Sequence, residues 1–279
     1  MRCTGSYSSG SPIVSPTDGL HHTASGDHGA PALLFLHGFM GSSADWLDVT
    51  AALEDRFRCV APDLPGHGAS LGLPSGAYSF EGAARATVHT LEELDIEQAT
   101  FVGYSMGGRL ALYFALRYPE RCAALFLESA SPGIENAAER EARRRSDGEK
   151  AARLASGDFE RFLMDWYSQP LFASLTRRDG LVEGMISARR GNDPAELALA
   201  LTGMGIGAQP SLWGELPDVV VPALAVVGEH DEKFVALSRR MAGASPNMRA
   251  AVVPGAGHNV RVEAPEEYVA SLKGFLEAL

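Results

Sequence analysis

The clearest pattern along the chain is a series of short, continuous apolar runs, each followed by a turn and most by a stretch of helical periodicity. Apolar runs of this length predict strands buried on both faces of a parallel sheet. We expect strands over Ala32–His37, Phe57–Ala61, Thr100–Tyr104, Ala123–Glu128, Ala223–Gly228 and Arg249–Pro254. We expect helices over Ala44–Leu53, Phe80–Leu94, Met106–Arg117 and about Pro265–Leu279. This alternation predicts an α/β fold with a doubly wound, mostly parallel sheet.

The alternation is interrupted between about residues 132 and 216. Charged segments with helical periodicity occupy this stretch, over Ala138–Leu154, Phe159–Tyr167 and Leu181–Arg189. Because the stretch begins at the carboxyl end of an expected strand, where open α/β sheets bind ligands, we interpret it as a helical cap. A separate small domain is the weaker alternative, since strands of the same sheet resume after it.

The expected organisation is one α/β domain over residues 32–279 that contains this cap. Residues 1–31 are rich in Ser, Gly, His and Pro and are expected to form an irregular lead-in, with Pro12–Val14 as a possible strand fragment.

Composition narrows the class of protein. Hydrophobic residues make up 46% and charged residues 21% of the 279 residues, as in globular proteins. The formal net charge of −11 argues against nucleic acid or an anionic membrane as a partner. There is no apolar run of membrane-spanning length and no secretory signal, and the three cysteines match no metal motif. We therefore expect a cytoplasmic protein, and the sequence leaves open whether it is a monomer or a homo-oligomer.

A G-x-S-x-G pattern stands at Gly103-Tyr104-Ser105-Met106-Gly107. It follows an expected strand and precedes an expected helix, which is the context of a nucleophile elbow. The turn is so tight that side chains two residues before and after the serine would clash, which accounts for Gly103 and Gly107. The pattern predicts that Ser105 is a catalytic serine at a helix N-terminus.

A catalytic serine needs a base, and the base needs an orienting acid. In this fold the chain order is serine, acid, histidine. Asp231 follows the expected strand Ala223–Gly228, and His258 follows the last expected strand. We therefore predict Asp231 as the acid and His258 as the base. Glu229 and His230 are the main rivals.

The negative charge that develops in such a site is stabilised by two backbone N–H groups, which form an oxyanion hole. One is expected from Met106, directly after the serine. The other is expected from Phe39, in the loop after the first strand. His37, before Gly38, is interpreted as shaping this loop rather than as a base. The turn Asp63–Gly68 is interpreted as structural.

Several motifs together resemble the α/β-hydrolase superfamily. They are His37-Gly38-Phe39, Asp63-Leu64-Pro65-Gly66-His67-Gly68, the serine motif continued by Gly108-Arg109, and Gly255–His258. Other segments resemble one subfamily, the 2-succinyl-6-hydroxy-2,4-cyclohexadiene-1-carboxylate synthases of menaquinone biosynthesis. They are Arg143–Asp147, Asp165–Leu175, Gln209–Trp213 and Gly228–Phe234. The likeness runs from Ala32 to the C-terminus, and the longer N-terminal segment departs from it.

The resemblance implies a carbon–oxygen lyase that eliminates pyruvate from 2-succinyl-5-enolpyruvyl-6-hydroxy-3-cyclohexene-1-carboxylate, with no metal and no organic cofactor. The expected partner is this small-molecule polycarboxylate. Ser105, activated by His258, would take the proton alpha to the succinyl carbonyl. The residues that match the family's substrate-binding positions are Tyr104, Arg109, Arg143, Trp166 and Arg189, the last across a small insertion. Guanidinium groups suit carboxylates because their forked donors engage both oxygens.

Two other functions remain open from the residues alone. A carboxylesterase or a C–C bond hydrolase of the same fold would carry the same triad, and an apolar rather than a basic cap would favour it. A non-enzymatic ligand-binding member of the fold would be favoured if Asp231 and His258 lay far apart. Without the resemblance, Arg143–Arg145 would be read as a solvated charged face.

Overall fold

The computed structural model describes residues 19–279, so the possible strand at Pro12–Val14 lies outside the described residues. A seven-stranded sheet with the order β1-β3-β2-β4-β5-β6-β7 forms its centre. The strands are β1 His22–Ser25, β2 Ala32–Leu36, β3 Arg58–Pro62, β4 Ala99–Tyr104, β5 Cys122–Glu128, β6 Ala223–Gly228 and β7 Met248–Val253. All neighbours pair in parallel except β1, which is antiparallel to β3. The predicted doubly wound α/β class is confirmed.

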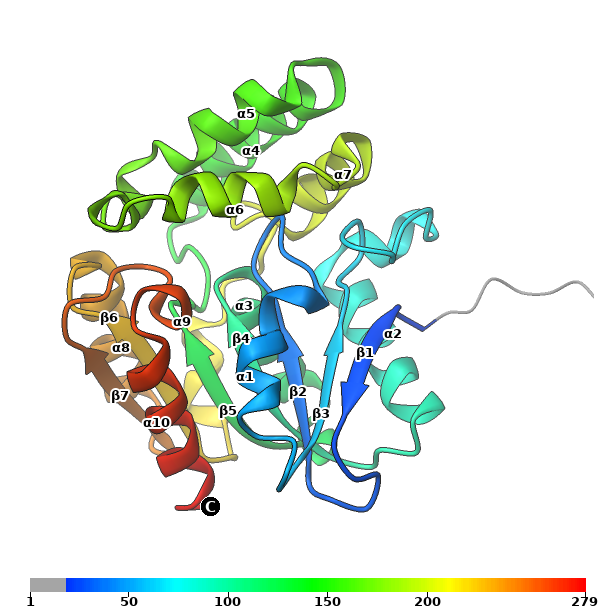
Figure 1. The fold of residues 1–279 in the computed structure, drawn as a ribbon, viewed down its shortest axis with the longest axis vertical. Helices are drawn as coiled ribbons and strands as arrows, with labels where there is room; N and C mark the ends of the chain where they lie inside the picture. The colour runs from blue at the N-terminus through cyan, green and yellow to red at the C-terminus, as the bar shows by residue number, and fades with distance from the viewer. Residues whose placement is uncertain (1–18) are drawn as a thin grey trace, which may run out of the picture.

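Helices cover both faces of the sheet (Figure 1). They are α1 Leu47–Ala51, α2 Phe80–Glu93, α3 Met106–Arg117, α8 Glu232–Ala244, α9 Val260–Glu263 and α10 Pro265–Leu276. One apolar core packs α2, α3 and α8 against the sheet, and a second packs α1 and α10 against the other face. Central strand β4 is buried at every position, which explains its continuous apolar sequence.

The N-terminal segment is more ordered than its sequence suggests. Residues 1–31 were expected to be irregular, and this expectation is wrong for His22–Ser25, which forms edge strand β1. The strand is short and polar, so it produces no apolar run. Polar contacts attach the segment before it to the sheet, since Asp63 N–H donates to the His21 carbonyl at 2.7 Å and His21 Nδ1 lies 2.7 Å from Asp63 Oδ2.

The segment between β5 and β6 lies over the carboxyl ends of the strands (Figure 1). Its helices are α4 Ala137–Ser156, α5 Phe159–Tyr167, α6 Leu181–Arg189 and α7 Pro194–Met204. They enclose a third apolar cluster, into which Met40 of the main domain projects. Helix α7 was not predicted, although Asp193 caps its first turn and Pro194 stands at its start, a recognised helix-start signal. Among the described residues, no helix combines the length and apolarity needed to cross a bilayer.

Candidate active site

Ser105 stands in a strained turn between β4 and α3. Its φ of 49° and ψ of −106° lie in a region that non-glycine residues rarely adopt. Its N–H donates to the Glu128 carbonyl at 2.8 Å, which holds the turn against β5. A Cβ on Gly107 would lie 2.1 Å from the Leu36 carbonyl oxygen, and one on Gly103 would lie 2.6 Å from Gly108 Cα. Only glycine therefore allows the backbone to pass so closely.

This close approach makes a stability prediction. Gly107→Ala is expected to lower the free energy of unfolding by about 1–3 kcal/mol or more, because the backbone of β2 cannot move aside. Gly243→Ala is the matched control in helix α8, where nothing lies within 4 Å of the added carbon. That control should gain up to about 1 kcal/mol from helix propensity. Thermal unfolding of both variants measures the difference, and equal unfolding temperatures would contradict the packing argument.

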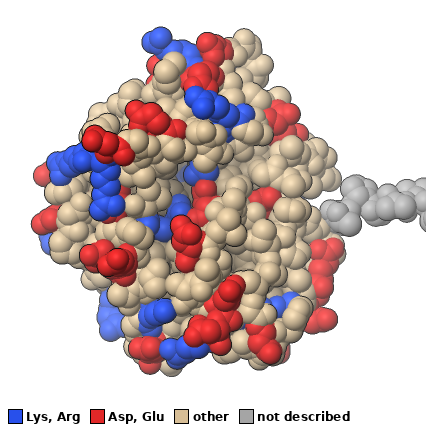
Figure 2. Space-filling view, viewed as in Figure 1, with Lys and Arg blue, Asp and Glu red and all other residues tan. Residues whose placement is uncertain are grey.

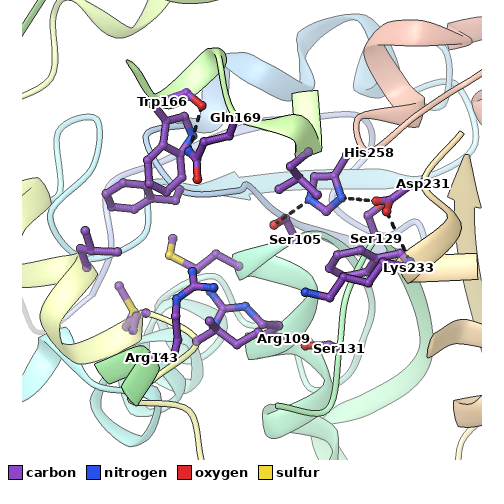
Figure 3. Close-up of a pocket in the computed structure, with 18 of the residues that line it drawn as sticks. Ser105, Arg109, Ser129, Ser131, Arg143, Trp166, Gln169, Asp231, Lys233 and His258 are labelled. Atoms are coloured by element: carbon purple, nitrogen blue, oxygen red, sulfur yellow. Dashed lines mark hydrogen bonds and ion pairs between the residues drawn. The ribbon is translucent and has the colours of Figure 1, made fainter. Parts of the chain in front are cut away.

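Ser105, His258 and Asp231 form one hydrogen-bonded chain (Figure 3). His258 Nδ1 lies 2.6 Å from Asp231 Oδ2, and its Nε2 lies 3.4 Å from Ser105 Oγ. A carboxylate beside Nδ1 favours the tautomer with a proton there, which leaves the Nε2 lone pair for the hydroxyl proton. The Ser–His contact is long, as is common before substrate is bound.

Glu229 and His230, the alternatives for these roles, are not part of the hydrogen-bonded set of Ser105, His258 and Asp231. Glu229 accepts a hydrogen bond from Gly255 N–H at 3.0 Å, and His230 is exposed on the surface. Asp231 has a second task, because its carboxylate accepts from Phe234 N–H at 3.3 Å and so caps helix α8. The helix start and the histidine therefore hold the same carboxyl group in place.

The loop after β2 orients the Phe39 amide. His37 Nε2 accepts from Leu64 N–H at 2.9 Å, so its Nδ1–H donates to the Gly38 carbonyl, 2.8 Å away. Gly41 N–H donates to the same carbonyl at 3.0 Å. In a trans peptide the N–H points opposite to the carbonyl, so this anchoring turns the Phe39 N–H away from His37.

The second expected donor is the N–H of Met106, the first residue of α3, which has no partner within the helix. Within residues 19–279 neither this N–H nor that of Phe39 donates a turn, loop or cap hydrogen bond to a backbone carbonyl. Both residues line the cavity beside Ser105.

A cavity of about 440 Å³ opens between these hydrogen-bonded catalytic candidates and the cap helices. Figure 3 shows Ser105 and His258 at one side and two arginines, Arg109 and Arg143, at another. Trp166 lies on the cap side, packed between Phe39 and Phe162. Sequence reasoning missed several polar residues that line the same cavity, because two of them have no motif, and Gln169 and Lys233 lie in the family-like segments without a role having been assigned to them. They are Ser129, Ser131, Gln169 and Lys233.

Arg109 is a buried cation with no carboxylate partner among the described residues. Its side chain is held by Gln209 Oε1 at 3.3 Å and by the face of Phe80, and only 9% of the residue is exposed. Burial, and after it the positive charge of Arg143, lowers the pKa of Arg109. Arg143 pairs with Asp147 at 2.7 Å. An uncompensated buried charge of this kind favours an anionic ligand.

Two residues named from the sequence do not line the cavity. Tyr104 is buried behind it, with its ring 5.7 Å from that of His258. Arg189 makes two hydrogen bonds to Asp45, of 2.6 and 2.7 Å, where cap helix α6 meets the main domain. Although burial alone would raise the pKa of Asp45, the charges of Arg189 and Arg261 hold it below its usual value. The structure therefore uses Arg189 as a cap contact, and its expected role in substrate binding has no support in this geometry.

Arg189→Met is expected to act on stability. It leaves a carboxylate that is 11% exposed without its partner, which costs about 3–5 kcal/mol in comparable buried pairs. Since the pKa of Asp45 is lowered by folding, the contribution of the pair is present above about pH 4 and is lost as the pH falls through the folded value. Thermal unfolding at pH 7 tests this.

The neighbouring Arg190→Met is the matched control. It breaks only an exposed pair with Glu160, which solvent screens, so unfolding should stay close to that of the wild type. A variant at position 189 with unchanged unfolding and a raised KM would instead restore the substrate-binding interpretation.

No group of three or more His, Cys, Asp or Glu side chains arranged to hold a metal ion is found within residues 19–279.

Comparisons with known proteins agree with this architecture. Residues 31–265 match the family model of the alpha/beta hydrolase fold. A putative 2-succinyl-6-hydroxy-2,4-cyclohexadiene-1-carboxylate synthase of Bacillus subtilis is 36% identical over 95% of this chain and 98% of its own. The 2-succinyl-6-hydroxy-2,4-cyclohexadiene-1-carboxylate synthase of Enterobacter sp. is 36% identical over 91% of this chain and 95% of its own. The structure of MenH from S. aureus is similar with a TM-score of 0.88 and 32% identity, covering 92% and 98% of the two chains. The crystal structure of an enol-lactonase from Burkholderia xenovorans is similar with a TM-score of 0.79 and 26% identity, covering 92% of this chain and 96% of its own.

The chain is thus an enzyme of the α/β-hydrolase fold family. Within that fold it belongs to the family of 2-succinyl-6-hydroxy-2,4-cyclohexadiene-1-carboxylate synthases, which takes part in menaquinone biosynthesis.

Proposed function

We propose that this enzyme eliminates pyruvate from 2-succinyl-5-enolpyruvyl-6-hydroxy-3-cyclohexene-1-carboxylate. The observation that carries the proposal is Arg109, a buried cation in the same cavity as Ser105 that has no carboxylate partner within residues 19–279. The substrate has three carboxylates, so it supplies anions that can pair with this arginine. An uncharged ester would leave the buried charge uncompensated, which is unfavourable.

The reaction is a 1,4-elimination across the ring. Ser105 Oγ takes the proton from ring carbon 2, alpha to the succinyl carbonyl, while its own proton passes to His258 Nε2. The electrons of the broken C–H bond form a double bond between carbons 2 and 3. The former 3,4 double bond moves to carbons 4 and 5, and the C5–O bond breaks. The departing enolate is protonated to pyruvate, which leaves the 2,4-diene.

The roles of the neighbouring groups follow from where charge develops. As carbon 2 loses its proton, negative charge moves onto the succinyl carbonyl oxygen. The N–H groups of Phe39 and Met106 are proposed to receive that oxygen, each worth about 3–4 kcal/mol in comparable sites. Asp231 keeps His258 oriented and stabilises the imidazolium that forms. Arg109 and Arg143 bind substrate carboxylates, and Trp166 packs over the ring from the cap side.

A coupled assay tests the proposal. Purified protein is given the enolpyruvyl cyclohexene substrate, and pyruvate is followed with lactate dehydrogenase, beside a parallel assay with an uncharged aryl ester. We expect saturable pyruvate release and little ester turnover. No pyruvate, together with rapid ester hydrolysis that requires Ser105, would overturn the proposal in favour of a general esterase of this fold.

A further inference from the structure

A second polar wall of the cavity has no task in the reaction as described so far. Lys233 follows Asp231 by two residues, at the start of α8, and its side chain lines the cavity. Ser129 and Ser131 line it too, from the loop that leaves the carboxyl end of β5. In Figure 3 the lysine amine points into the pocket, on the side where Arg109 and Ser131 are labelled.

None of these three side chains has a polar partner among residues 19–279; Lys233 is exposed, and its amine lies 5.8 Å from the centre of the Phe234 ring. No carboxylate oxygen of residues 19–279 lies within 4.0 Å of the Lys233 amine. The hydroxyl oxygens of Ser129 and Ser131 are buried and lack any hydrogen-bond partner among the described residues. Buried hydroxyl groups are normally paired, so two unpaired ones beside a free cation indicate a ligand with several acceptor atoms. A carboxylate has two oxygens and suits such a set.

We propose that Lys233, Ser129 and Ser131 form a second carboxylate subsite, separate from the one that Arg109 and Arg143 provide. The inference rests on the proposed function, because it assigns one of the three substrate carboxylates to this wall. It gives the cavity a third cation for the third negative charge. Lys233 acts as a point charge on a flexible stem, and the two serines supply the directed hydrogen bonds.

The position of the wall selects which carboxylate it binds. Proton removal takes place at ring carbon 2, so that carbon lies next to Ser105. Pyruvate leaves from carbon 5, which is directly across the ring and points away from the serine. Lys233 stems from the same helix start as Asp231, close to the serine and histidine. The wall therefore binds a carboxylate near carbon 2, on the succinyl arm or on carbon 1, and the product retains both.

Binding of the product to Lys233→Met tests the subsite. By titration calorimetry we expect product affinity to fall by about 10- to 100-fold, as for the loss of a charged hydrogen bond. Lys233→Arg should recover most of it. Ser131→Ala and Ser129→Ala should each lose about 2- to 10-fold. Inhibition by pyruvate should stay unchanged, because pyruvate lacks the retained carboxylates.

Lys273→Met is the matched control, with the same loss of charge on helix α10. Product affinity in Lys233→Met within twofold of this control would overturn the subsite. Weaker inhibition by pyruvate with unchanged product binding would overturn the assignment to a retained carboxylate. A wild-type protein that neither releases pyruvate nor binds the product would instead refute the proposed function. The two failures are therefore distinguishable.

Discussion

Replacing His258 by alanine is expected to lower kcat for pyruvate release by about 10²- to 10⁴-fold, the usual contribution of a positioned general base. The reason is geometric. His258 Nε2 is the hydrogen-bond acceptor that faces Ser105 Oγ, at 3.4 Å, and without it the hydroxyl proton has no acceptor among residues 19–279. Substrate binding should change little, because the carboxylates are held on other walls. Steady-state kinetics of the coupled assay therefore separates the loss of kcat from a nearly constant KM.

His230→Ala is the control for this variant. It removes a neighbouring histidine whose exposed side chain makes no hydrogen bond to Ser105, His258 or Asp231, so its kinetics should match those of the wild type. The double variant Ser105→Ala with His258→Ala should be about as slow as either single one, since residues that act as one unit are not additive. A loss of kcat/KM that came from a raised KM alone, with kcat unchanged, would contradict the base role of the histidine.

Replacing Arg109 by methionine is expected to lower kcat/KM by about 10²- to 10³-fold, because truncating one partner of a buried charge pair costs about 2–5 kcal/mol or more. The same change should raise the unfolding temperature of the free enzyme. In the unliganded state the guanidinium has no carboxylate partner in the described part of the chain, so a methionine of similar volume removes an unfavourable buried charge.

Opposite changes of activity and stability are the signature of a residue kept for its ligand. Arg117→Met is a suitable control, since Arg117 lies on the same helix and pairs with Glu215 away from the cavity. Calorimetric unfolding and the coupled assay measure the two effects on the same protein samples. If Arg109→Met lowered both stability and activity, the arginine would be a packing residue.

The sheet and most helices could be predicted because burial imposes a simple pattern on them. Strands β2 to β6 are largely apolar and buried, whereas edge strand β7 is exposed at three of its six positions. All six strands begin and end within about two residues of the predicted bounds. Strand β1 was missed because a polar edge strand is attached by individual hydrogen bonds such as that between Asp63 and His21. Helix α8 was not predicted either, although Asp231 caps its first turn as Asp193 does for α7.

The candidate site was predictable to the extent that motifs mark it. Ser105, Asp231 and His258 were singled out by their places after strands, and they lie in one hydrogen-bonded chain; their catalytic roles stay predictions. Lys233 lies in the family-like segment Gly228–Phe234, but the resemblance gave it no role, and only the fold shows that it lines the cavity. Arg189 shows the opposite case, because a match of sequence position does not reveal that Asp45 occupies its donors.

The most direct test of the account is a single turnover with excess enzyme, in which pyruvate release and the intact mass of the protein are followed together. The account predicts that pyruvate and the diene form at the same rate, that no mass is added to the enzyme at any time, and that Ser105→Ala abolishes the reaction. A transient adduct on Ser105, or unchanged pyruvate release in Ser105→Ala, would contradict a serine that acts as a base.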